Sequence, residues 1–300
     1  MPIIVSTLGF PSTDDRGSAD CWHRQRELGV THIPSNSPHD CPVQAFKAAK
    51  QDGVHTRPVV VSPLSGPARL GVAETRACLK DLAAAGADWV QVDEFCLTVP
   101  LDDAARGRLL SFYQSIAEAT PSLKILVNAG RGSLGENRRF AVSLPIAGLH
   151  VDCTGRGDQF SDVVVDAPAG LYLSLGLVDA KDRDQTDIGA LLPRLEAAAF
   201  QRGLAIASGL RTNPWPTDLG SAPQDLDGLA IQLGLDRLIL APGSSLADAS
   251  TERAEQCVAA LTLLAQGLAE GRSVIGSAVP GSVPPGVLSL AQARSVRSAA

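Results

Sequence analysis

Polar and acidic residues end several short apolar runs in this sequence. The clearest run is "DWVQVDEF", in which two adjacent carboxylates, Asp93 and Glu94, follow alternating apolar and polar residues. Other runs end at or near Asn128, Asp152 and Asp179. Carboxylates and amides that meet in one pocket can bind an ammonium group, orient a polar ligand or transfer a proton. We therefore asked which fold would bring these residues together.

The alternation in "WVQVDE" separates two faces of a predicted strand. Val90 and Val92 share one face, while Gln91 and Asp93 share the other. We expect the valines to pack outwards on helices and Asp93 to point into the opening at the carboxyl end of the strands. Glu94 is expected just past the strand, with a different role. No Lys or Arg occupies the strand positions that this alternation places on the inward face. We therefore expect few cations near Asp93.

The same phase recurs in later runs. In "LHVDC", Leu149 and Val151 alternate with His150 and Asp152. The leucines of "LYLSLG" alternate with polar residues in the same way. Strands with one apolar and one polar face fit a closed sheet that has helices outside and a polar site inside.

Eight β-rich runs alternate with amphipathic, Ala/Leu-rich segments along the chain. The runs start at Ile3, Val30, Arg57, Asp88, Leu123, Ala147, Leu171 and Gly203. The clearest helical segments are 73–87, 102–119, 186–203 and 250–271. This order predicts an α/β fold, a single (β/α)8 TIM barrel over residues 1–271. Residues 272–300 are rich in Gly, Pro and Ser and are predicted to form a disordered tail.

Polar residues recur at the predicted carboxyl ends of the strands, where barrel enzymes build their sites. They are Thr7, Asn36, Ser62, Asp93, Asn128, Asp152, Asp179 and Ser208. The sequence therefore predicts a polar pocket at this rim.

Composition narrows the classes of partner and location. The formal net charge is −6 and no basic patch is visible, which argues against nucleic acid. No apolar run is long enough to span a membrane, and "MPIIVSTLGF" does not resemble a signal peptide. Six cysteines without CxxC spacing indicate reduced thiols and a cytoplasmic protein.

A second interpretation comes from the glycines after the fifth run. Gly130, Gly132 and Gly135 form a GxGxxG pattern, and Asp152 ends the next run. This arrangement matches a dinucleotide-binding fingerprint. However, the following "ENRRFAVSLP" is short and highly charged, and four strand units precede the pattern, so a turn-forming loop is the preferred interpretation.

Several segments together resemble the cobalamin-independent methionine synthases. They are "STLGFP", "WVQVDE", "SLPIAGLHVD" and "LSLGLVDAKDRDQTDI", and the similarity extends from about Ile3 to Asp218. That family has two related barrels, and the resemblance is mainly to the N-terminal one. It implies methyl transfer from methyltetrahydrofolate to homocysteine, with homocysteine or methionine and the folate as small-molecule partners.

The resemblance also implies site residues. Asp152 and His150 would be catalytic. The substrate-binding set would be Gly9, Phe10, Asp93, Asn128, Asp179 and Ser208. Asp93 would hold the substrate ammonium group.

The family's catalytic barrel carries zinc, which this chain is poorly equipped to bind. The ligand positions correspond to Asn128, Gly130, Asp152 and Ser208, and three of these four are poor zinc ligands. A different zinc site would draw on Cys96, Cys153, His150 and Asp152. No metal ligand is assigned, and zinc is implied by the resemblance alone. The alternative function is therefore a non-catalytic barrel that binds a folate or an amino acid, or that partners a separate catalytic barrel.

Overall fold

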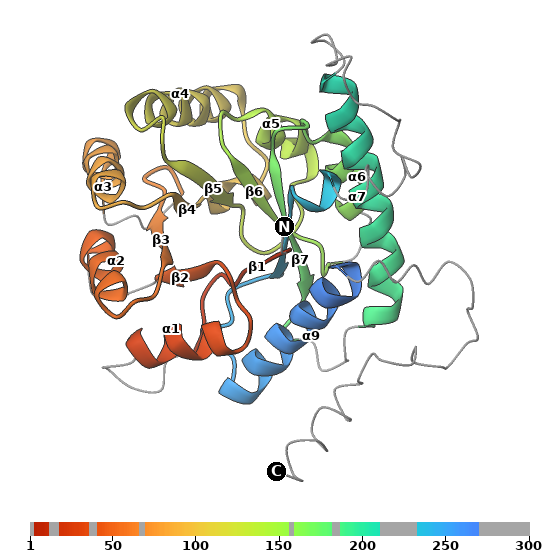
Figure 1. The fold of residues 1–300 in the computed structure, drawn as a ribbon. Coiled ribbons are helices and arrows are strands. Elements are labelled where there is room, and N and C mark those ends of the chain that lie inside the picture. Colours follow the sequence, from red (N-terminus) through yellow and green to blue (C-terminus); the bar gives the residue numbers. More distant parts are fainter. Residues whose placement is uncertain are drawn as a thin grey trace, which may run out of the picture.

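A ring of parallel strands surrounded by helices forms the molecule (Figure 1). The computed structural model describes residues 3–11, 18–35, 41–65, 70–155, 159–181, 187–210 and 233–269. The predicted tail and Asn36 lie outside these ranges.

The strands follow one another around the ring in chain order. They are β1 (Ile4–Val5), β2 (Ile33–Ser35), β3 (Thr56–Val61), β4 (Trp89–Asp93), β5 (Lys124–Asn128), β6 (Gly148–Asp152), β7 (Tyr172–Val178) and β8 (Leu238–Pro242). Hydrogen-bonded neighbours run β1-β8-β7-β6-β5-β4-β3-β2, and a parallel bridge between Ser6 and His32 joins the two ends of this order. The sheet is therefore a closed (β/α)8 barrel, as predicted.

Helices connect successive strands on the outside of the ring. They are α1 (Ser18–Glu27), α2 (Pro42–Gln51), α3 (Val72–Ala84), α4 (Asp103–Ala119), α5 (Arg138–Ser143), α6 (Gln159–Asp166), α7 (Ile188–Leu210) and α9 (Thr251–Ala269), with short 3-10 turns η1 (Phe95–Thr98) and η2 (Gly135–Asn137). The Asp102 carboxylate caps α4 by accepting from the Ala105 amide at 2.7 Å. Among the helices of the described ranges, none has the length and apolarity that crossing a bilayer requires.

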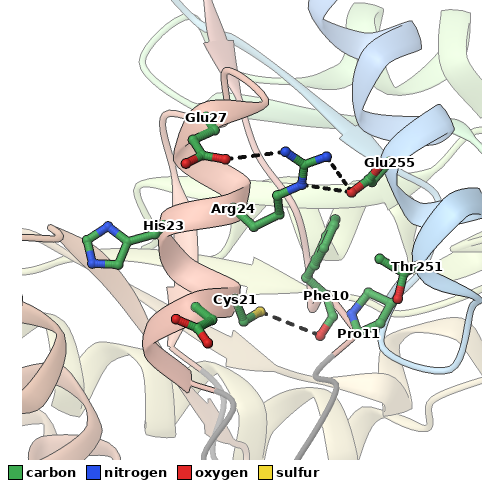
Figure 2. Close-up of a pocket in the computed structure, with 9 residues that line it drawn as sticks. Phe10, Pro11, Cys21, His23, Arg24, Glu27, Thr251 and Glu255 are labelled. Carbon is green, nitrogen blue, oxygen red and sulfur yellow. Dashed lines mark hydrogen bonds and ion pairs between the residues drawn. The ribbon is translucent and has the colours of Figure 1, made fainter. Parts of the chain in front are cut away.

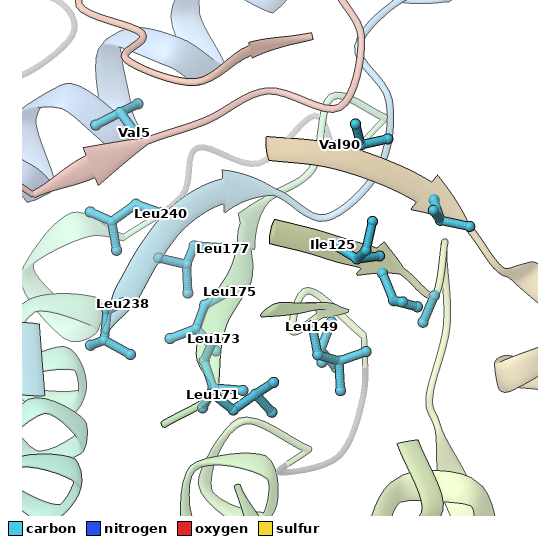
Figure 3. Packing of buried hydrophobic residues seen from close by; sticks show 14 of the residues in the cluster. Val5, Val90, Ile125, Leu149, Leu171, Leu173, Leu175, Leu177, Leu238 and Leu240 are labelled. Carbon is cyan, nitrogen blue, oxygen red and sulfur yellow. The ribbon is translucent and has the colours of Figure 1, made fainter. Parts of the chain in front are cut away.

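The strand phase read from the sequence is confirmed. Val90, Val92, Leu149 and Val151 are fully buried in the cluster between strands and helices. Figure 3 shows such side chains on neighbouring strands of the barrel. Each fully buried Leu or Val contributes about 1.5 to 3 kcal/mol relative to an exposed position, so this outer layer is a main source of stability.

The predicted eighth strand is wrong, and with it the placement of Ser208. Residues 203–210 form the last part of α7, so Ser208 lies in a helix and not at the end of a strand. Buried Leu195, Ala199 and Arg202 recur at helical spacing, which continues the helix through this region. The true strand, β8, is the continuous apolar run "LILAP", a pattern typical of a strand buried on both faces.

Aromatic side chains close the amino-terminal end of the barrel. The rings of Trp89 and Tyr172 pack edge to face with their centroids 5.2 Å apart. Gly148 lies beside them, where an added Cβ would be 2.9 Å from Leu126. Lys124 lies over the Trp89 ring, with its Nζ 5.3 Å from the centroid. This end is thus filled, and the opposite end is left for a site.

Arg202 provides a first test of the fold. Its guanidinium is buried under the α6–β7 connection and donates to the carbonyls of Ala167, Pro168 and Leu171. Arg202→Met keeps much of the volume but leaves buried acceptors unpaired, so we expect the free energy of unfolding to fall by about 3 kcal/mol. Urea denaturation measures this change. An unchanged midpoint would show that the carbonyls find other donors.

Candidate functional site

Asp93 and Asn128 lie side by side at the carboxyl-terminal mouth. They are register partners at the ends of β4 and β5. The Asp93 Oδ1 accepts from Asn128 Nδ2 at 2.8 Å and from Gln91 Nε2 at 2.6 Å. Among the residues that the structure describes, none donates to Oδ2 of Asp93. One carboxylate oxygen is therefore held in place and the other is available to a ligand.

A buried cation, Arg57, lies inside the barrel near this carboxylate. Arg57 is only 2% exposed and donates to Ser6 Oγ, to the Thr7 carbonyl and to Gln91 Oε1, each at 2.7 Å. The expectation that no cation occupies the inward strand positions is wrong. Arg57 opens the third apolar run, so in the sequence it resembles a residue that precedes a strand. It lies two residues before Val59, the register partner of Gln91, and therefore on the same inward face of β3.

Burial and hydrogen bonding act in opposite directions on Asp93. Burial raises the pKa of Asp93, whereas the hydrogen bonds from Gln91 and Asn128 and the charge of Arg57 lower it. Burial also lowers the pKa of Arg57 to about 10, against the attraction of Asp93. Arg57 thus stays charged at neutral pH and favours an ionised Asp93.

Exposed apolar residues neighbour Asp93 along the chain and across the sheet. Val61, the register partner of Asp93, is 37% exposed, and Phe95 is 45% exposed. The Phe95 ring lies against Gly130, which has a φ of +79° and where an added Cβ would be 2.6 Å from the ring. A carboxylate beside exposed apolar groups suits a ligand with a cationic head and an apolar body.

Glu94, the second carboxylate of the opening motif, has a structural role. It lies just past β4, as predicted, and is fully buried. Its carboxylate accepts from Ser65 Oγ, from Tyr113 Oη at 3.0 Å and from Cys96 Sγ at 3.1 Å. Burial together with this carboxylate raises the pKa of Cys96 to about 12, so this thiol is unsuited to bind metal or act as a nucleophile.

Asp152 also lies at the mouth, but its oxygens are occupied. Oδ1 accepts from the Thr154 amide and hydroxyl at 2.9 and 2.6 Å, and Oδ2 accepts from the Gly132 amide at 2.9 Å. It therefore fixes the loop after β5. Its catalytic role stays a prediction.

His150 lies below the mouth and is fully buried. Its Nδ1 is 2.9 Å from Ser174 Oγ, and its Nε2 has no hydrogen-bond partner among the described residues. Burial lowers the pKa of His150 to about 4, which keeps the ring neutral at physiological pH. His150 is the register partner of Asn128, and its catalytic role also stays a prediction.

The GxGxxG loop is already bonded to the protein's own side chains. The amides of Gly130 and Gly132 donate to Asn128 Oδ1 and Asp152 Oδ2, at 3.0 and 2.9 Å. The Gly135 amide donates to Ser133 Oγ at 3.1 Å. A phosphate site needs such amides free and a helix N-terminus behind them. The loop leads instead into the three-residue η2, which favours the turn-forming interpretation.

The remaining predicted substrate residues lie elsewhere on the rim. Asp179, just past β7, pairs with Arg131 at 2.6 Å. Gly9 and Phe10 follow β1, and Phe10 lines a separate cavity of about 380 Å³ between α1 and α9 (Figure 2). In this cavity the Arg24 guanidinium forms ion pairs with Glu27 and Glu255, so the charges of these three side chains are paired.

The positions at which the family would hold zinc do not come together as a metal site among the described residues. In the described part of the chain, no three His, Cys, Asp or Glu side chains are grouped to hold a metal ion. Of the positions expected from the family, Asn128 and Asp152 are engaged in hydrogen bonds, Gly130 has no ligating side chain and Ser208 lies in α7. Cys153 packs beside the outer cluster.

The fold and mouth define a (β/α)8 barrel with a polar, carboxylate-bearing site at the carboxyl ends of its strands. Residues 72–202 match the model of the cobalamin-independent synthase N-terminal domain. The chain is thus related to the cobalamin-independent methionine synthases through that domain, and the resemblance found in the sequence is confirmed.

Similar proteins are methyltransferases by name. A 5-methyltetrahydropteroyltriglutamate–homocysteine methyltransferase of Caulobacter vibrioides is 34% identical over 266 residues, covering 80% of this chain and 31% of that protein. The same-named protein of Nitrobacter winogradskyi is 38% identical over 176 residues, covering 54% of this chain and 23% of that protein. This chain therefore spans a third or less of the length of these relatives.

Solved structures support the fold. A B12-independent methionine synthase from Shewanella sp. W3-18-1, in complex with selenomethionine, superposes with a TM-score of 0.60 at 12% identity, covering 90% of this chain and 99% of that one. A methyltransferase from Methanosarcina mazei superposes with a TM-score of 0.53 at 13% identity, covering 87% and 94%. At these identities the similarity concerns the barrel alone.

Proposed function

We propose that this chain is a cytoplasmic methyltransferase-family barrel of methionine biosynthesis. In the proposed reaction, the homocysteine thiol loses its proton, its sulfur takes the methyl group from N5 of methyltetrahydrofolate as the N–CH3 bond breaks, and N5 takes up a proton, giving methionine and tetrahydrofolate. The observation that carries the proposal is Asp93 at the mouth, whose Oδ1 accepts from Asn128 and Gln91 while no described residue donates to its Oδ2, in a chain related to proteins named for this reaction.

In this proposal Asp93 accepts hydrogen bonds from the ammonium group of the amino acid. The apolar body of homocysteine or methionine then lies against Val61 and Phe95. Asn128 holds the carboxylate through Oδ1, which leaves Oδ2 pointing to the ligand. These residues account for binding and orientation.

The second candidate is a barrel that binds the same ligands without turnover, alone or beside a separate catalytic barrel. It is favoured by the positions expected to hold zinc, which are Asn128, Gly130, Asp152 and Ser208, because they do not form a metal site. The two candidates share ligand binding at Asp93 and differ in chemistry.

Calorimetric titration and a methyl-transfer assay distinguish these functions. We expect L-methionine and L-homocysteine to bind, and 4-methylthiobutanoate, which lacks the ammonium group, to bind at least tenfold more weakly. Transfer of labelled methyl from methyltetrahydrofolate to homocysteine supports the enzyme, and binding without transfer supports the second candidate. If none of the amino acids bind, the enzyme and an amino-acid-binding barrel both fail, and titration with methyltetrahydrofolate then tests a folate-binding barrel.

A further inference from the structure

Gln91 connects the buried cation Arg57 to the Asp93 carboxylate. Its Oε1 accepts from Arg57 Nη2 at 2.7 Å, and its Nε2 donates to Asp93 Oδ1 at 2.6 Å. Gln91 is fully buried and lies one inward position below Asp93 on β4. The three side chains therefore form one continuous path from the barrel interior to the mouth.

The chemistry of the two ends fixes the orientation of the Gln91 amide. A guanidinium can only donate, and an ionised carboxylate can only accept. Only one orientation of the amide satisfies both neighbours. Gln91 therefore cannot turn over without losing both hydrogen bonds while Asp93 is ionised.

Arg57 is itself held in one position. Nη1 donates to Ser6 Oγ, and Nη2 is shared between the Thr7 carbonyl and Gln91. Its Nε has no hydrogen-bond partner among the described residues. The buried charge of Arg57 is screened by little water, and it lowers the pKa of Asp93, although by less than the hydrogen bonds from Gln91 and Asn128 do.

We propose that Arg57 and Gln91 are positioning residues, which keep Asp93 ionised and hold its Oδ2 towards the mouth to receive a primary ammonium group. The identity of the ligand rests on the proposed function. The ionisation state and the orientation of the Asp93 carboxylate do not depend on the proposed function.

The other charged or titratable groups on the elements around β4 are placed differently. Lys124 on β5 lies at the opposite end of the barrel, over Trp89. Tyr113 on α4 bonds to Glu94, and its pKa is raised well above its usual value by burial. On β6, His150 is neutral and Asp152 is bonded to Gly132 and Thr154. Among these described groups, Arg57 is the cation that acts on Asp93.

The first test needs no ligand. Carbon-13 NMR of labelled aspartate, with Asp93→Asn to assign the signal, gives the pKa of Asp93 directly. We expect Arg57→Met to raise this pKa by about 1 and Gln91→Met to raise it in the same direction, whereas Arg57→Lys keeps it closer to the wild-type value. The matched control is Arg202→Met, which removes a buried guanidinium from α7 and is expected to leave Asp93 unchanged.

The second test measures L-methionine binding between pH 5 and 8 by calorimetry. We expect Gln91→Met to weaken binding about tenfold at pH 7 and to shift the loss of binding at acidic pH to a higher pH. Arg202→Met should retain the wild-type pH profile.

The outcomes separate this inference from the proposed function. An Asp93 pKa that is the same in wild type, Gln91→Met and Arg57→Met overturns the inference. If Arg57→Met does not fold, Gln91→Met and Arg57→Lys decide it. A shifted pKa in a protein that binds no methionine supports the inference and rejects the ligand of the proposed function.

Discussion

Asp93→Asn is expected to weaken L-methionine binding by about 1.5 to 3 kcal/mol, the range for a hydrogen bond to a charged group. Asparagine keeps the shape of the side chain and its contact with Asn128, but it removes the negative charge that Oδ2 offers to an ammonium group. Calorimetric titration at pH 7 measures the change. The matched control is Asp88→Asn, the same substitution just before the other end of β4, where the carboxylate pairs with exposed His55.

The same substitution should leave stability unchanged or raise it. Because the pKa of Asp93 is raised on folding, the folded state binds a proton more readily than the unfolded state. The ionised carboxylate therefore reduces the free energy of unfolding at pH above its folded pKa, and Asp93→Asn removes that penalty. Thermal melts of the wild type and of Asp93→Asn test this expectation. Unchanged binding together with lost stability would mean that Asp93 serves the fold alone.

The barrel could be predicted because apolar and polar residues alternate along several of its strands. Val90 and Val92 alternate with Gln91 and Asp93, and this pattern fixes both the strand and the face that meets the helices. The eighth strand could not be placed in this way. "GLAIASGL" has strand-like residues, but the helix that begins at Ile188 continues through it, since its buried face packs on the barrel.

The site was predicted less completely than the fold. Asp93 and Asn128 were predictable because strand ends meet at one mouth in a barrel. The link between Arg57 and Gln91 depends on side chains from two strands meeting across the interior, a distance that periodicity in one segment does not encode. The burial of Glu94 depends on Tyr113 of α4 and Ser65 of a neighbouring loop, so it too requires the assembled fold.

Acidification between pH 6.5 and 4 is expected to destabilise this protein through a neutral, buried His150. The pKa of His150 is about 4 in the folded protein because of burial, against 6.5 as its ordinary value. As the pH falls below 6.5, the unfolded chain binds a proton at His150 that the folded protein does not bind. The free energy of unfolding therefore decreases until the pH passes the folded pKa, by about 3 kcal/mol in total. His32, whose pKa is also about 4, adds a smaller loss because it is partly exposed.

Urea denaturation at pH 7, 6 and 5 separates this effect from other titrations. His150→Gln removes the titrating ring, so its stability should fall less with acid than that of the wild type, even if it is less stable at pH 7. Carboxylates and His32 titrate in both proteins and cancel in the difference. His55→Gln, at a position that is 61% exposed, is the control for the substitution itself. If His150→Gln runs parallel to the wild type, the pKa of His150 is not lowered by burial in the folded protein.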